Sequence, residues 1–460
     1  MTAPSTPTGG YPPAFPRKAQ PVAFRGSSAD RSSHSRRARL ENQASRGALG
    51  EGEHLVRAHP VLSLFAASLI AFAPVHALAQ DRDREARTSV RERPRPDYDP
   101  LGLRFGGFTL HATLDLDAVH SDNIFAEETG EDEDTIFVAA LRTRLQSNWS
   151  RHALAIEAGG AASMYDEFAS EDHETAFAGV SGRLDIGSRS NLSARARVAQ
   201  EIEPRNDPDA PGQGIPLVEY ERSELAVSAQ HTFNRFRVTA TAAQSQNEYD
   251  AGQSFRDFEE TSLTGRLEAE LTPRIGLLAQ ATTDERDYDN TPALSSEGRT
   301  YLAGLTINLT DLMEGQVAVG HFERDYDSGI TTDGVAASAN VEWYVTRLTT
   351  ISFNARRNSE DVVGATTAIP YVESEYGGRV DHELMRNVIL TAGAQFGRRE
   401  YEGIDRDDDF MRADVGADYL VNRRVVVRGR YMHDEVESEG VNRYRDYEEN
   451  RFTLGVGLRL

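Results

Sequence analysis

From about residue 101 to residue 460, the chain consists of runs in which apolar and polar residues alternate. Between residues 335 and 345 every odd-numbered position is apolar, and Ser338, Asn340 and Glu342 are among the residues that separate them. Alternate residues of a β-strand point to opposite faces of a sheet, so each run predicts a strand with one apolar and one polar face.

Short turns join these runs in pairs, and longer polar loops separate the pairs. The first and last of eight turns lie 272 residues apart, so the seven periods between them average about 39 residues. Propellers, solenoids and barrels all have periods of this size. A propeller blade would need four strands per repeat, whereas each repeat here holds two long ones. The turns centre on Ser150-Arg151, Arg189-Ser190, Asn234-Arg235, Pro273-Arg274, Asp311-Leu312, Thr346-Arg347, Arg386-Asn387 and Asn422-Arg423.

Counting two strands for each turn, with both chain ends on the same side, predicts 18 strands from residues 104–120 to residues 447–460. Even strand numbers are typical of bacterial outer-membrane barrels. Apolar residues make up 39% of the chain, mean hydropathy is -0.53, and no run after residue 80 approaches the roughly 20 apolar residues of a membrane helix. A barrel needs only every second strand residue to face lipid. We therefore expect an all-β, transmembrane, antiparallel up-and-down barrel in a Gram-negative outer membrane, among lipid and lipopolysaccharide, with short periplasmic turns and longer acidic extracellular loops.

The region before the barrel divides into three predicted segments. Residues 55–79 have the order of a secretory signal peptide, with an apolar run over 61–73 and small residues at Ala77 and Ala79, so cleavage is expected after Ala79. Residues 1–54 are interpreted as a disordered extension or a start codon assigned too early, with a twin-arginine signal as the weaker alternative. The charged, Pro-containing residues 80–103 predict a disordered periplasmic tail before the barrel at 104–460.

The last strand resembles the signal that the barrel-assembly machinery reads, which makes that machinery an expected partner. Its elements are Thr453, Gly455, Leu458 and Leu460, with Leu at the last position where Phe is commoner. A second repeated feature is a tyrosine next to an acidic residue at the outer strand ends. Because tyrosine suits a membrane interface, we expect an aromatic girdle. Its members are Tyr165, Tyr249, Tyr288, Tyr326 and Tyr401.

If the apolar positions face lipid, the opposite positions face the lumen, and arginine is in excess among them. Such charges either pair across strands and stiffen the wall or set a field that selects solutes. Pairing is the simpler interpretation, and the excess of arginine favours anionic sugars as solutes. The positions assigned to the lumen are Arg142, Arg144, Glu157, Arg195, Arg197, Arg237, Arg266, Glu268, Arg356, Arg379, Asp381, Arg412, Asp414, Asp418, Arg428 and Arg430.

The third outer loop, residues 202–218, is rich in Pro and Gly. We interpret it as a mobile surface loop in preference to a constriction folded into the pore. The acidic runs 127–134 and 405–409 are interpreted as solvated loops, with dedicated calcium or magnesium sites as the alternative, and we predict no metal site and no cofactor.

The sequence offers no basis for an enzyme or a nucleic-acid-binding protein. Hydrolase, zinc-protease and phosphate-loop motifs are missing, and there is no cysteine. The chain has a net charge of -23, and residues 1–79 carry nine basic and four acidic residues, so the remainder is near -28. Such a charge disfavours nucleic acid as a partner.

Residues 106–125, which end in Asp122-Asn123-Ile124-Phe125, are followed by an acidic loop and residues 134–137. This element resembles the start of the putative β-barrel porin 2 family, and the resemblance covers residues 104–460. It implies an outer-membrane channel, a conduit for exopolysaccharide or capsule export by passive passage, working with a periplasmic polysaccharide-export protein. The alternatives are a general or small-solute diffusion porin and a closed structural or adhesive surface barrel. The Asp122-Asn123 pair also suits a simple turn.

Overall fold

A computed structural model describes residues 88–460 except 209, 211, 251, 310–311 and 364–367. All of these belong to one compact unit, Val56–Leu460. The predicted extension 1–54, the signal peptide 55–79 with Ala77 and Ala79, and residues 80–87 lie outside the described residues. In the described part, no helix has the length and apolar character needed to span a membrane.

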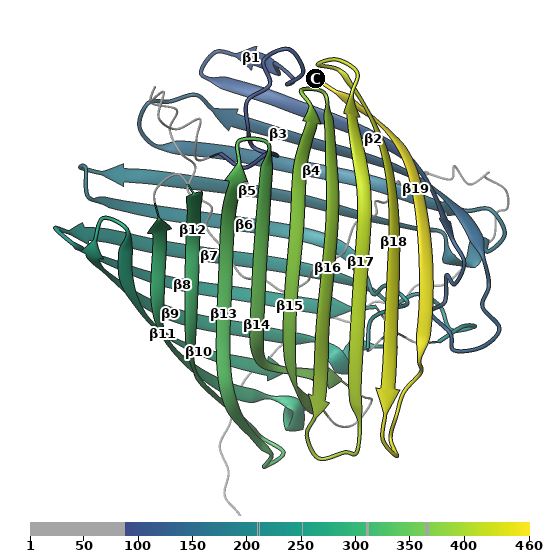
Figure 1. Ribbon diagram of the computed structural model, residues 1–460. Coiled ribbons are helices and arrows are strands. Elements are labelled where there is room, and N and C mark those ends of the chain that lie inside the picture. Colours follow the sequence, from purple (N-terminus) through teal and green to yellow (C-terminus); the bar gives the residue numbers. More distant parts are fainter. Residues whose placement is uncertain (1–87, 209, 211, 251, 310–311, 364–367) are drawn as a thin grey trace, which may run out of the picture. The chain divides into compact units, whose positions relative to one another are not determined.

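The described chain forms nineteen β-strands that lie in one antiparallel sheet (Figure 1). Three single-turn 3-10 helices, η2 (Ala169–Glu171), η3 (Ser254–Arg256) and η4 (Pro292–Leu294), lie in the longer loops. The strands are β1 (Leu103–Phe105), β2 (Phe108–Ser121), β3 (Asp134–Ser147), β4 (Ala153–Tyr165), β5 (His173–Ile186), β6 (Ser190–Ile202), β7 (Glu219–Phe233), β8 (Phe236–Tyr249), β9 (Phe258–Thr272), β10 (Ile275–Tyr288), β11 (Ser296–Leu309), β12 (Met313–Tyr326), β13 (Thr331–Thr346), β14 (Thr349–Val363), β15 (Ala368–Met385), β16 (Val388–Tyr401), β17 (Asp407–Leu420), β18 (Val425–Glu439) and β19 (Tyr447–Arg459).

The sheet closes on itself because β19 pairs with β2, with Gly455 opposite Asp117. The three-residue β1 pairs only with the start of β2, so eighteen of the nineteen strands form the barrel wall. The predicted fold class and strand number are confirmed. The predicted short turns coincide with junctions between consecutive strands, with Ser190 and Thr346 as the terminal residues of β6 and β13, and Asp311 lies outside the described residues.

Side chains alternate between the two faces of the wall as the sequence pattern predicts. On β3, Phe137 and Leu141 are exposed on the outer face, whereas Val138 and Ala140 are buried on the inner face. Directly opposed residues of neighbouring strands share a face, so the pattern continues around the barrel. Val317 of β12, for example, lies opposite Ala339 of β13. The wall therefore presents apolar side chains outward and most of its charges inward.

The predicted disordered tail is wrong for residues 88–103. Residues 90–92 and 96–98 form turns, and Val90 is fully buried against Ile389, Leu420 and Val426 at the inner end of the barrel. The charged composition hides this docking, because the partners of the segment lie about 290 residues further along the chain.

Candidate functional site

The structure places all sixteen predicted lumen residues on the face opposite the exposed apolar side chains. Several of them pair across strands: Arg144 lies 3.1 Å from Glu157, and Arg237 lies 2.9 Å from Glu268. Arg266 also contacts Glu268, at 2.7 Å. Cross-strand pairing, the simpler of the two interpretations, thus accounts for much of the lumen charge.

Two lumen arginines differ from the others. Among the described residues, the side chains of Arg142 and Arg430 make no ion pair and no hydrogen bond, and both are exposed on the inner face. Arg142 is five residues from the end of β3, and Arg430 is five residues from the start of β18, so both lie in the half of the barrel near the short turns. These two guanidinium groups are available to a passing anion.

The third outer loop is not a free surface loop. Arg205 is buried and forms a bidentate ion pair with the buried Glu171, at 2.8 and 2.9 Å. Glu203 pairs with Arg256, and the amide of Asn206 donates to Asp434 on β18 at 3.0 Å. The loop therefore extends from its own strands to the opposite part of the outer mouth. The alternative of an inward-folded constriction agrees with this geometry, and the surface-loop interpretation does not.

A second segment narrows the lumen from another direction. β14 pairs with β13 only as far as Arg357 opposite Ala337, although β13 continues its pairing with β12 to Thr331. β14 and β15 remain paired with each other to Val363 opposite Ala368. The described outer part of this hairpin, residues 358–363 and 368–372, thus leaves β13, and Figure 1 shows the lower part of β14 turning away from it.

The detached hairpin packs against the inner face of β10 to β13. Val372 forms a buried apolar cluster with Phe322 and Ala336. The side chain of Asp361 is only 1% exposed and pairs with Arg286, while the hydroxyl of Tyr288 donates to Asp361 at 3.3 Å. The sequence carries only a weak local signal of the bend, because Ser359 and Asp361 are polar at positions whose counterparts Ile351 and Phe353 face lipid.

A cavity of about 580 Å³ lies between the third loop and the hairpin. Its lining includes eight arginines and seven carboxylates, so its fixed charges nearly balance. The arginines are Arg222, Arg256, Arg286, Arg299, Arg324, Arg356, Arg399 and Arg412. Of these, the sequence assigned only Arg356 and Arg412 to the lumen. No group of three or more potential metal ligands occurs among the described residues.

The predicted tyrosine girdle requires correction, because these side chains face inward. Tyr288, Tyr326 and Tyr401 are buried, and Tyr165 and Tyr249 occupy the same inner face of their strands. Arg256 lies 4.5 Å above the ring of Tyr249. The sequence contains a pattern that predicts this inward orientation. Three of the tyrosines follow an arginine by two positions, which puts both residues on one face of a strand.

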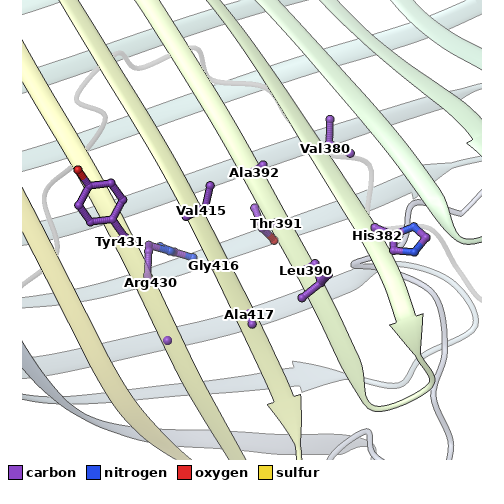
Figure 2. A pocket seen from close by; sticks show the side chains of 11 residues that line it. Val380, His382, Leu390, Thr391, Ala392, Val415, Gly416, Ala417, Arg430 and Tyr431 are labelled. Atoms are coloured by element: carbon purple, nitrogen blue, oxygen red, sulfur yellow. The ribbon is translucent and has the colours of Figure 1, made fainter.

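The outer face carries a separate apolar groove of about 530 Å³ on β15 to β18. Figure 2 shows Val380, Leu390, Val415 and Tyr431 among its lining side chains. These residues share the lipid-facing parity of the wall, so the groove does not belong to the pore.

The four residues of the predicted assembly signal lie at the seam between the first and last wall strands. Leu458 points outward, and the backbone N–H of Leu460 donates to Ala112 at 2.9 Å. Thr453 and Gly455 lie on the inner face, where a side chain at Gly455 would overlap the carboxylate of Asp117. Recognition of this strand by the assembly machinery stays a prediction.

The match to a known protein family agrees with the barrel. A family model described as putative beta-barrel porin 2 matches residues 95–460. Crystal structures of OpdL and of OccK2 (OpdF) in complex with glucuronate, both from Pseudomonas aeruginosa, match 77% of this chain with TM-scores of 0.43 and 0.45. The match covers 100% of OpdL and 98% of OccK2, at 14% and 12% identity. A BenF-like porin from Pseudomonas fluorescens has a TM-score of 0.43 at 9% identity over 77% of this chain and 100% of that one. A comparison with curated protein sequences found no match.

Proposed function

Because the chain belongs to the putative β-barrel porin 2 family and is an outer-membrane β-barrel channel, we propose that it passes small hydrophilic solutes and prefers anions. Porin families and porin-like barrels are typically non-enzymatic. The observation that carries the proposal is the cavity between the third loop and the detached hairpin.

The size of the cavity favours small solutes over a polymer. A volume of about 580 Å³ falls in the range of small-molecule sites, roughly 300 to 1,000 Å³. An eighteen-stranded barrel with an empty lumen would be much wider, since barrels of 16 to 18 strands leave an aqueous channel. Two inserted segments therefore restrict what can pass, and a polymer would require both to move.

The charge distribution favours anions. The cavity itself is nearly neutral, so it offers polar contacts to sugars and organic acids without a strong field. Nearer the short turns, Arg142 and Arg430 add two positive charges that make no ion pair with another described residue, although both lie within electrostatic reach of the carboxylate of Asp117. A charged pore lined by low-dielectric walls concentrates ions of the opposite sign.

Passive export of exopolysaccharide or capsule, the function implied by the family resemblance, ranks second. It would add a periplasmic polysaccharide-export protein as partner and would require the third loop and the hairpin to withdraw. A closed structural or adhesive barrel ranks third. It would require the inserted segments to seal the lumen, whereas a cavity of about 580 Å³ lies between them.

Planar-bilayer recordings of the purified full-length protein test the proposal. We expect measurable conductance, an anion-selective reversal potential in a salt gradient, and reduced current when a small organic acid is added. Replacing the two free arginines in the double variant R142A/R430A should lower the anion-to-cation permeability ratio by about twofold. The matched control is Arg274→Ala, which removes an exposed arginine in a turn outside the lumen.

Each alternative gives a different recording. Absence of conductance would favour the closed barrel. Block by added polysaccharide, with no effect of small organic acids, would favour the export conduit. An unchanged permeability ratio in R142A/R430A would refute the assignment of the anion preference to these two arginines. It would leave the proposal of an open channel in place.

A further inference from the structure

The inner face of β14 to β18, near the short turns, carries a set of buried carboxylates that hold arginine side chains of the N-terminal segment. We propose that Asp381, Glu383 and Asp418 form a guanidinium-binding site that the chain fills with its own Arg91 and Arg95. Residues 89–99, here called the latch, thereby close part of the periplasmic mouth. The closing role of the latch rests on the proposed channel function, whichever solute passes.

Arg91 occupies the first part of the site. Its Nε donates to Asp381 at 2.7 Å, and one terminal nitrogen lies 3.5 Å from Asp418. The other terminal nitrogen donates to the hydroxyl of Thr391, which in turn donates to Asp381 at 2.8 Å. All three guanidinium nitrogens thus have acceptors, an arrangement that suits the planar donor set of arginine.

Arg95 occupies the second part, around Glu383. Its side chain is 3% exposed and that of Glu383 is 2% exposed, and the two are 2.9 Å apart. Arg93 lies 3.4 Å from the same carboxylate. Without the latch, Glu383 would keep one ion-pair partner among the described residues, Arg386 at 3.4 Å. A carboxylate this deeply buried is costly without a close partner, so the site is built to hold a guanidinium group.

Apolar and backbone contacts fix the latch in one position. Val90 is fully buried among Ile389, Leu420 and Val426, and its backbone N–H donates to the hydroxyl of Thr350 at 3.0 Å. At the other end, Arg459 donates to the carbonyl of Tyr98 at 3.1 Å. The latch therefore contacts β14 to β19 from the inside.

The latch is removable, since it adds no strand to the sheet. Its internal structure consists of two turns, with hydrogen bonds from Arg93 to Ser89 and from Asp99 to Arg95. Its attachment to the wall is made by side chains and a few backbone groups. A free guanidinium compound can compete for the same carboxylates, and loss of the latch leaves the wall intact.

The position of the latch is measured by the reactivity of a cysteine at Ser89. The chain has no cysteine, and Ser89 is 9% exposed, so the single variant Ser89→Cys gives one buried reporter that changes only one atom. In full-length, membrane-purified protein we expect slow labelling by a maleimide. Adding R91A/R95A should accelerate labelling about tenfold, because the charge-assisted bonds that hold the segment are lost.

Two further comparisons distinguish loss of the carboxylate–guanidinium contacts from a non-specific destabilisation of the protein. Asp381→Asn combined with Glu383→Gln keeps the volume of the site and should accelerate labelling in the same way. Arg104→Ala removes an exposed arginine of β1 and should leave labelling slow. Guanidinium chloride at low concentration should accelerate labelling of the Ser89→Cys protein, and an equal concentration of potassium chloride should not.

Single-channel recording tests the closure of the mouth. We expect R91A/R95A to raise the conductance about twofold relative to Arg104→Ala, because the narrowest sections of a pore limit conduction. Retained heat-modifiability on gels verifies that each variant is a folded barrel. Slow labelling in R91A/R95A would overturn the site. Fast labelling with unchanged conductance would overturn the closure, and equal effects of potassium and guanidinium would overturn the guanidinium specificity.

Discussion

Replacing Asp361 by alanine should release the β14–β15 hairpin from the inner wall. The Asp361 side chain, 1% exposed, pairs with Arg286 and accepts a hydrogen bond from Tyr288 at 3.3 Å. Breaking a buried ion pair by removing one partner costs about 3 to 5 kcal/mol. In the variant, Arg286 still pairs with Glu260, at 2.7 and 3.0 Å, so its charge keeps a partner. We therefore expect the substitution to weaken docking of the hairpin by about 2 to 3 kcal/mol.

A loss of about 2.7 kcal/mol shifts the docking equilibrium of the hairpin by roughly a hundredfold. The apolar cluster of Val372 with Phe322 and Ala336 would then remain as a contact between the hairpin and the inner wall. In planar bilayers, Asp361→Ala should show a larger conductance state that is rare in the wild-type protein, or spend much more time in it. The dwell-time ratio of the two states gives the free energy directly.

The matched control is Glu360→Ala, one residue away on the opposite face of the same hairpin. Glu360 pairs with Arg356 at 2.8 Å, and both side chains are partly exposed, so its removal should cost about 1 kcal/mol or less. If Asp361→Ala and Glu360→Ala behave alike, or if neither alters the conductance states, the hairpin is not held as a gate by the Asp361 pair.

The remaining predictions concern the third loop and the barrel seam. Burial raises the pKa of Glu203 above its ordinary value, with Arg256 opposing the shift, so the docked loop binds a proton more tightly than a released loop does. Acidification through the window between the raised and the ordinary pKa should therefore strengthen docking and lower the conductance, and Glu203→Gln should abolish this response; a rise in wild-type conductance would contradict the sign. Gly455→Ala should destabilise the seam by about 1 to 3 kcal/mol, because a Cβ would overlap a carboxylate oxygen of Asp117. Gly429→Ala, whose Cβ would meet only Leu454 at 3.7 Å, is the control in a urea unfolding series, and equal midpoints would refute the steric argument.

The sequence predicts the wall of this barrel well because the wall obeys a local rule. Alternation within each strand, together with turn residues, determines the strand number and which residues face inward. The sixteen lumen positions follow from that rule, and so would the inward tyrosines. Tyr288 shares a face with Arg286 two positions earlier, and that spacing is as informative as the general preference of tyrosine for interfaces.

What fills the lumen could not be predicted in the same way, since it depends on contacts between distant segments. Asn206 meets Asp434 from 228 residues away, and Arg91 meets Asp381 from 290 residues away. On the strand face that should meet lipid, β14 carries the polar Ser359 and Asp361, and Asp361 contacts Arg286 and Tyr288 of the inner wall instead. These two polar residues are the only local hint, because a charge facing lipid is expensive.

These inserts act at opposite ends of the lumen, which determines how their effects combine. The third loop and the hairpin narrow the outer half, whereas the latch contacts the ends of β14 to β19 near the short turns. Two constrictions along one water path add as resistances in series. Release of one constriction lowers the total resistance only by the resistance of that constriction. When the outer half widens, the latch therefore accounts for a larger fraction of the remaining resistance. A channel of this kind can respond to conditions on each side of the membrane through a different set of ion pairs: Asp361 and Glu203 outside, Asp381 and Glu383 inside.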